Sequence, residues 1–193
     1  ICETIGTLNM PSVSEKLGQM AAQAAMVEGL VYGMESGGGY YNGYYVPDRN
    51  LMYTAQVLTQ QLYPEFITSM REIAGGGLIM LPSSVKDFEN PEIARYIHAT
   101  QNSAVGTSEE KVKFMKLAWD AIGSEFASRH TQYEMFYAGA QFVTRGHALR
   151  TYDWNRSKIL VDDILNSYNL EDMFEKKNVA AEWLFIEKFL IFY

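Results

Sequence analysis

The chain has 193 residues, enough for one folded domain with a substantial core. Its formal net charge of −7 argues against nucleic acid and against an anionic membrane surface as partners, because both need clustered Lys and Arg. The single cysteine, Cys2, excludes a disulfide framework, a zinc site or a cysteine-ligated iron–sulfur cluster made by this chain alone, and it fits a reducing, cytoplasmic location. No apolar run approaches the ~20 residues of a membrane span. Because the sequence starts at Ile1, we expect either a fragment or a processed product.

A first long helix is expected over roughly residues 13–35. Ser12 and Glu15 have the spacing of a capping box at its start. Apolar residues follow at steps of three and four, which indicates the core helix of a bundle: Leu17, Met20, Ala24, Val27, Val31 and Met34. In the next stretch, 36–48, Asn42-Gly43 between tyrosine pairs predicts a tight turn. This loop either packs on the bundle or contributes to an aromatic pocket or a subunit contact.

A second helix is expected over roughly residues 48–74, with Pro64 kinking or breaking it. It ends in Gly75-Gly76-Gly77. One glycine is enough to cap a helix, so three in a row before an apolar segment suggest that another chain or a ligand approaches the backbone. A phosphate cradle would need a following helix N-terminus, whereas this sequence predicts an extended segment there.

Asn90-Pro91 predicts a short helix to about Thr100, and the dominant helix of the chain is expected from Thr107 to Gly139. Thr107 and Glu110 have capping-box spacing. An inward-facing stripe is predicted over about seven turns, and seven of its eight positions are apolar or aromatic: Val112, Met115, Trp119, Ile122, Phe126, Arg129, Tyr133 and Phe136.

Arg129 is the exception in that stripe, and a buried arginine must find an anion because an unpaired buried charge is costly. Glu125, one turn earlier, is placed for an i,i+4 pair. The alternative is an anionic ligand, such as a phosphate, that reaches into the bundle. Spacing alone leaves both interpretations open.

The rest of the chain is also predicted to be helical. One helix is expected over 140–152, and Asp153 is expected to cap the helix that follows it. A last amphipathic helix is expected in the segment that contains Trp183 and Leu190. Three histidines, none with a matched carboxylate, are interpreted as structural: His98, His130 and His147. The residues therefore predict a mostly α, long-helix bundle without a catalytic constellation.

Three segments together resemble a known family: GGGLIMLPSSVKDFENPEI, LAWDAIGSEFASRHTQYEMFYAG and RTYDW, with EKLGQM near residue 15. The resemblance is to the C-terminal domain of the 4-hydroxyphenylacetate 3-monooxygenase family. It implies an acyl-CoA-dehydrogenase-like architecture, in which 1–193 is a single C-terminal helical bundle and the family's N-terminal helical and central β-domains are absent from this chain.

The same resemblance implies an activity for the intact protein. A separate flavin reductase would supply reduced FAD, and the oxygenase would use oxygen to hydroxylate a small phenolic substrate ortho to its hydroxyl group. The bundle would help to hold FAD and assemble a homotetramer. The chain alone is expected to be inactive.

The resemblance also implies candidate FAD contacts at Arg129, Ser124 and Gln132, and at the turn Gly75, Gly76 and Gly77. Two alternatives stay open. One is a non-catalytic helical domain for oligomerisation or interaction. The other is part of a 4-hydroxybutyryl-CoA dehydratase-like flavoprotein, which the single cysteine disfavours.

Overall fold

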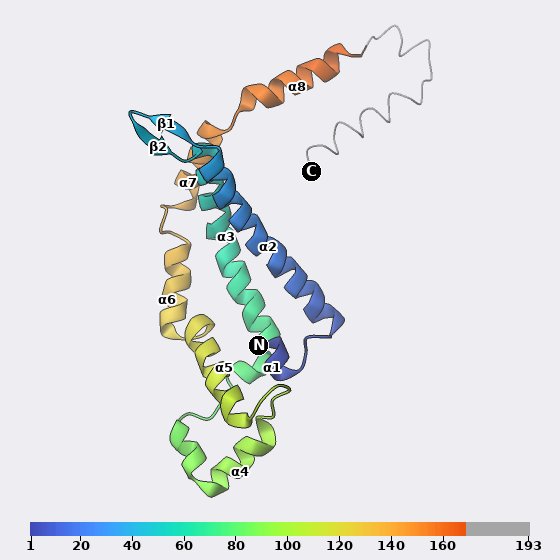
Figure 1. The fold of residues 1–193 in the computed structure, drawn as a ribbon, viewed down its shortest axis with the longest axis vertical. Helices are drawn as coiled ribbons and strands as arrows, with labels where there is room; N and C mark the ends of the chain where they lie inside the picture. The colour runs from blue at the N-terminus through green and yellow to red at the C-terminus, as the bar shows by residue number, and fades with distance from the viewer. Residues whose placement is uncertain (169–193) are drawn as a thin grey trace, which may run out of the picture. The chain divides into compact units, whose positions relative to one another are not determined.

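The structure, a computed structural model, describes residues 1–168 and is helical through most of that range (Figure 1). The chain divides into two compact units, Ile1–Thr151 and a second that starts at Tyr152. The expected helix around Trp183 lies outside the described residues. The first unit contains the short helix α1 (Cys2–Ile5), the long helices α2 and α3, and the elements α4 to α7. The fold-class prediction, a mostly α long-helix bundle, is confirmed.

Helix α2 (Pro11–Ser36) begins one residue earlier than the proposed Ser12 cap. Met10 is the N-cap and makes no side-chain cap, so the predicted capping box is wrong. Pro11 occupies the first turn, where its missing N–H is no loss because that group has no partner inside the helix.

The expected turn is a two-stranded antiparallel hairpin, β1 (Gly39–Tyr41) and β2 (Tyr44–Val46). Both turn residues have positive φ, 50° at Asn42 and 82° at Gly43, as a two-residue hairpin turn requires. The tyrosine side chains of the hairpin are exposed.

Helix α3 (Arg49–Ala74) is the central helix of the unit and contacts α2, α5, α6 and α7. Asp48 caps it by accepting a hydrogen bond from the Leu51 amide. Pro64 lies inside α3, yet the helix continues to Ala74, so the break that we considered is absent. Packing on several sides compensates the lost backbone hydrogen bond, which shows that tertiary contacts outweigh a local helix breaker here.

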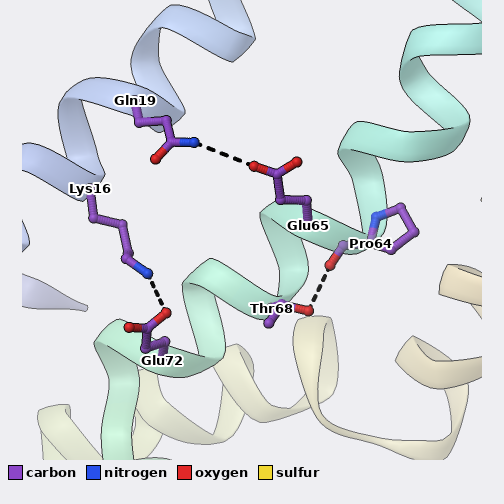
Figure 2. Close-up of polar contacts among 6 residues, drawn as sticks. All are labelled: Lys16, Gln19, Pro64, Glu65, Thr68 and Glu72. Carbon is purple, nitrogen blue, oxygen red and sulfur yellow. Dashed lines mark hydrogen bonds and ion pairs between the residues drawn. The ribbon is translucent and has the colours of Figure 1, made fainter.

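Polar side chains join α2 to α3 along their facing surfaces (Figure 2). Lys16 pairs with Glu72, and the Gln19 amide donates to the Glu65 carboxylate. Gln23, one turn further along α2, also donates to Glu65, at 3.0 Å. Glu65 therefore points toward α2 rather than into bulk solvent.

After α3 the chain makes two 3-10 turns, η1 (Gly75–Leu78) and η2 (Val85–Glu89), and then the short helix α4 (Pro91–Thr100). The three glycines themselves thus form a 3-10 turn with Leu78, and Ile79 after it also has helical φ and ψ, so the extended segment that we predicted directly after the glycines is absent. Asn90 caps α4 as expected, by accepting from the amides of Glu92 and Ile93.

The segment 107–139 is two helices, α5 (Ser108–Ile122) and α6 (Glu125–Glu134), and not one continuous helix. The predicted capping box of Thr107 and Glu110 is confirmed at the start of α5. The amides of Gly123 and Ser124 both donate to the Trp119 carbonyl, which ends α5. Ser124 then accepts from the Ala127 amide and starts α6.

The interruption changes which residues of the segment are buried. Val112, Met115 and Ile122 of α5 are buried, as the stripe predicted. The prediction is wrong for Trp119, which is 36% exposed, while its neighbour Ala118 is buried instead. The next buried residue is Ala127, five positions after Ile122 instead of four. The buried face of α6 is thereby displaced by one residue. The predicted stripe members after the break, three on α6 and one in the turn that follows it, are exposed: Phe126, Arg129, Tyr133 and Phe136.

Helix α7 (Gln141–Thr151) returns along α3 and is fixed to it by buried polar groups. The Thr144 hydroxyl donates to Oε1 of Gln60 at 2.8 Å, and Nε2 of Gln60 donates to the Gly139 carbonyl at 2.8 Å. Both side chains are buried. Because each polar group of this pair has a partner, the network joins α3 to the α6–α7 connection without an unsatisfied atom among these groups.

The main hydrophobic cluster lies where α3, η1 and α5 meet: Ile67, Ala74, Leu78, Met115, Ala118 and Ile122. Beside it, Nε of Arg71 donates to the Ile122 carbonyl at 2.6 Å, which satisfies a free carbonyl at the end of α5. In the second unit, helix α8 (Trp154–Asn166) is capped by Asp153, as expected.

Candidate functional site

Arg129 lies on the exposed face of α6, and its side chain is 80% exposed. Its prediction as an inward residue is wrong, because the break at Gly123 displaces the buried face of the helix. The i,i+4 pair with Glu125 is present, with 3.9 Å between Nη1 and Oε1. An ion pair this long and this exposed contributes little to stability. Because the Arg129 side chain is exposed and only weakly paired, its guanidinium group is accessible to another anion.

Aromatic side chains surround Arg129. An open hollow on this face is lined by Glu125, Phe126, Arg129, His130 and Tyr133. Phe126 and Tyr133 expose most of their surface. A cation between exposed rings is suited to a flat ligand that also carries negative charge, because the rings offer stacking area and the guanidinium group offers a charged fork.

Ser124 and Gln132 have different local roles on α6. The Ser124 hydroxyl donates to the Asp120 carbonyl at 2.9 Å and accepts from the Ala127 amide at 3.1 Å, so its only proton is already used. Gln132 is exposed and lies three residues after Arg129, which places the two side chains next to each other on the helix surface.

The glycine turn is a site where only one of three glycines is required by the backbone. Gly75 has φ 57° and caps α3, with its amide donating to the Arg71 and Glu72 carbonyls. A Cβ at Gly76 would meet nothing within 4 Å, and one at Gly77 would make ordinary contact with Met115. Nothing in residues 1–168 therefore explains why Gly76 lacks a side chain.

The structure does not bring the glycine turn and Arg129 into one pocket. The residues that line the hollow at Arg129 all lie on α6, whereas the glycine turn packs on α5. Arg129 and Gln132 lie on α6, and Ser124 is the N-cap directly before it. The six candidate residues thus form two separate groups.

The three histidines have partners that sequence reasoning missed. His98 Nε2 lies 3.7 Å from Oε1 of Glu109. His147 stacks on Tyr53 and accepts from Arg150 at its Nδ1 atom.

The third histidine, His130, has its Nε2 atom 2.9 Å from Oε1 of Glu134. The i,i+4 spacing of His130 and Glu134 was the available signal in the sequence, because side chains four residues apart meet on a helix.

His130 and Glu134 also line a second hollow, between α2, α3 and α6, with Tyr63 of α3. The His130 and Tyr63 rings lie 5.6 Å apart. Burial, and then the nearby Glu134 carboxylate, raise the pKa of the Tyr63 hydroxyl above its ordinary value. No sequence pattern marks Tyr63, because its neighbours come from three different helices.

Within residues 1–168, no cluster of three or more His, Cys, Asp or Glu side chains could hold a metal ion.

Over the same residues, the structure contains no helix with both the length and the apolar character needed to span a membrane.

Comparison with known proteins gives a family for this chain. The profile described as 4-hydroxyphenylacetate 3-hydroxylase C terminal matches residues 1–166. The chain belongs to this family. It is 35% identical over 147 residues to the 4-hydroxyphenylacetate 3-monooxygenase oxygenase component of Pseudomonas aeruginosa, covering 75% of this chain and 28% of that protein.

Other relatives match a similar share of this chain. The Escherichia coli oxygenase component is 34% identical, with 86% of this chain and 33% of that protein covered. A crystal structure of a 4-hydroxyphenylacetate 3-monooxygenase oxygenase component complexed with FAD matches with a TM-score of 0.79 and 27% identity, over 85% of this chain and 34% of that chain. The chain therefore spans about a third of the length of these relatives.

A more distant match extends the fold comparison. An oxygen-tolerant archaeal 4-hydroxybutyryl-CoA dehydratase from N. maritimus matches with a TM-score of 0.75 at 19% identity, over 87% of this chain and 34% of that chain. This likeness concerns the fold alone. The expected resemblance to the C-terminal domain of the acyl-CoA-dehydrogenase-like fold is confirmed.

Proposed function

We propose that this chain is the C-terminal, FAD-binding and oligomerisation domain of a phenol-hydroxylating oxygenase. In this proposal 1–193 forms one helical domain of a longer, homotetrameric protein. A separate flavin reductase would deliver reduced FAD, which when bound would supply the oxygen-activating chemistry. The oxygen atom would be inserted ortho to the hydroxyl group of a small phenol.

The observation that carries the proposal is the accessible Arg129 within an aromatic surface, in a chain of this family. A relative of the family has been crystallised with FAD. FAD combines an anionic pyrophosphate with flat rings, and the surface of α6 offers a guanidinium group between exposed Phe126 and Tyr133 rings. We assign Arg129 to bind the anionic part.

The other candidates support Arg129 in different ways. Gln132 would donate a side-chain hydrogen bond beside it, while Ser124 would act by starting α6 at the position that presents both. The free space at Gly76 would let FAD, from the same or a neighbouring subunit, approach the backbone of the turn. The separation of the turn from Arg129 in one chain favours contacts to FAD from two subunits.

Flavin titration of the 193-residue chain tests this assignment. Arg129→Ala should weaken FAD binding about tenfold, because a charge-assisted contact to phosphate is lost. Arg145→Ala is the matched control, since Arg145 is an exposed helical arginine of the same unit that donates to Gln141. Equal FAD affinity in both variants and in the wild type would contradict the role of Arg129.

The activity is tested in a chimaera. This chain would replace the C-terminal part of the P. aeruginosa oxygenase component that it matches. With reduced FAD, oxygen and 4-hydroxyphenylacetate, the chimaera should form a catechol. The chain alone should give none, because one part of a flavin site does not exclude water or position a substrate. A folded chimaera without product would contradict the proposal.

A second candidate function is a non-catalytic oligomerisation domain. Its support is the exposed tyrosine hairpin, because tyrosines are enriched in protein interfaces. Sedimentation together with flavin titration separates the two candidates: a stable oligomer that binds no FAD would favour this one.

A further inference from the structure

The hollow between α2, α3 and α6 has the composition of a small-ligand site. It has a volume of about 400 Å³, which lies within the usual range for such sites. Its apolar lining comes from two helices: Ala24 and Val27 of α2, and Leu62 and Phe66 of α3. The helix α6 contributes polar groups instead.

The polar groups converge at one side of this hollow. Glu134 is held by His130 through one oxygen, Oε1. Within residues 1–168, neither Oε2 of Glu134 nor the hydroxyl of Tyr63 has a hydrogen-bond partner. The Glu134 side chain is 26% exposed, so its charge is only partly screened by water.

The charge around the hollow is negative on more than one helix. Glu65 of α3 points toward α2, where Gln23, which lines the hollow, donates to it at 3.0 Å. His130 offers the only nitrogen base among the lining residues of this hollow. A ligand that carries a carboxylate would therefore be repelled by Glu134 in the lining and by Glu65 behind Gln23, whereas a cation would be attracted.

We propose that this hollow binds a small aromatic amine, with its ring against Ala24, Val27, Leu62 and Phe66 and its ammonium group on Glu134. The site excludes aromatic carboxylates by charge. It is distinct from the surface of Arg129 and does not depend on the FAD proposal, although His130 lies at the edge of both hollows.

Two probes of nearly equal size and opposite charge test the proposal by calorimetry on the 193-residue chain at neutral pH. Tyramine carries an ammonium group, and 4-hydroxyphenylacetate carries a carboxylate on the same phenol scaffold. Tyramine should bind saturably and at least about tenfold more tightly than 4-hydroxyphenylacetate. Equal affinities, or tighter binding of the acid, would overturn the proposal.

Three variants locate the binding. Glu134→Gln should weaken tyramine binding about tenfold and reduce the discrimination between the probes, because the charge is lost while the shape is kept. Ala24→Phe should abolish binding by filling the hollow from the exposed helix α2. Glu28→Gln, an exposed carboxylate of α2 outside the lining, is the control and should bind as the wild type does.

The variants also separate this proposal from the FAD assignment. Ala24→Phe should leave FAD affinity unchanged, and Arg129→Ala should leave tyramine affinity unchanged. If tyramine binding survives Ala24→Phe, the ligand lies elsewhere and the proposal fails. If Glu134→Gln does not fold, the probe pair and Ala24→Phe still decide.

Discussion

Helices α5 and α6 come from one continuous apolar pattern but have opposite environments. On α5 the pattern predicts three of its four stripe positions correctly, and Met115 has 0% exposed surface, whereas Trp119 is 36% exposed. On α6 the same pattern marks exposed residues, and Phe126 is 74% exposed. The one-residue displacement at the break accounts for the difference. A spacing pattern therefore predicts a face only as long as the helix that carries it is uninterrupted.

The largest expected effect tests whether the two helices really differ in burial. Met115→Ala should lower the free energy of unfolding by about 2–5 kcal/mol, because it opens a cavity in the core. Phe126→Ala should change it by less than about 0.5 kcal/mol. Urea unfolding followed by circular dichroism measures both. Similar losses would mean that the face of Phe126 is covered in solution, as an oligomer would cover it.

A second substitution tests how α7, which follows α6, is anchored to α3. Thr144→Val should cost about 1–3 kcal/mol, because it leaves Oε1 of the buried Gln60 without its donor. Thr151→Val on the same helix is the control, since its hydroxyl donates only within α7 to the His147 and Ala148 carbonyls. If urea unfolding gives equal effects for the two, the Gln60 network does not anchor α7.

The break itself is tested by removing the N-cap that follows it, with the N-cap at the start of α5 as a comparison. Ser124→Ala should cost about 1 kcal/mol, because the Ala127 amide loses its acceptor. Thr107→Ala should cost a similar amount at the start of α5. Thermal unfolding measures both losses, and Thr107→Ser is the control that keeps the hydroxyl. A stabilised Ser124→Ala variant would indicate that α5 and α6 tend to fuse into one helix.

The smallest expected effect is a pH dependence that links α3 to α6. Burial and Glu134 raise the pKa of Tyr63 in the folded state, so the neutral phenol stabilises the fold below its ordinary pKa of about 10. This contribution should be lost as the pH rises through that region, because the unfolded state ionises first. As the pH rises in the alkaline range, the free energy of unfolding should therefore fall more for the wild type than for Tyr63→Phe, as urea unfolding at a series of pH values would measure. Glu134→Gln should reduce this difference between the wild type and Tyr63→Phe. If the free energy of unfolding falls equally with pH in both proteins, Tyr63 does not link α3 to α6 in this way.

Local signals predicted much of the fold. The caps at Asn90, Thr107 and Asp153 and the turn at Asn42-Gly43 are all observed, because each depends on residues adjacent in sequence. Pro64 shows the limit of such signals, since packing around α3 keeps the helix continuous. Ser12 shows the same limit, because Pro11 starts the helix first.

The candidate site was predicted less completely. Ser124, Arg129 and Gln132 were correctly grouped on one segment, but the burial of Arg129 was wrong because Gly123-Ser124 was interpreted as helix interior. That dipeptide combines a helix stop with an N-cap residue, and the apolar spacing concealed it. The place of Tyr63 beside the His130–Glu134 pair could not be predicted, since Tyr63 lies on α3 and meets the pair only after α3 packs on α6.

The hydrogen bond from Arg71 to the Ile122 carbonyl links the two groups of candidate residues. Arg71 lies one turn before the glycine turn, and Ile122 is the last residue before the break that leads to Arg129. Arg71 is therefore connected both to the glycine turn and to the residues that precede α6. For this reason, the effects on flavin affinity of a substitution at Gly75 and a substitution at Ser124 should not be additive. A double-mutant cycle between Gly75 and Ser124, repeated in an Arg71→Ala background, would measure this coupling energy directly.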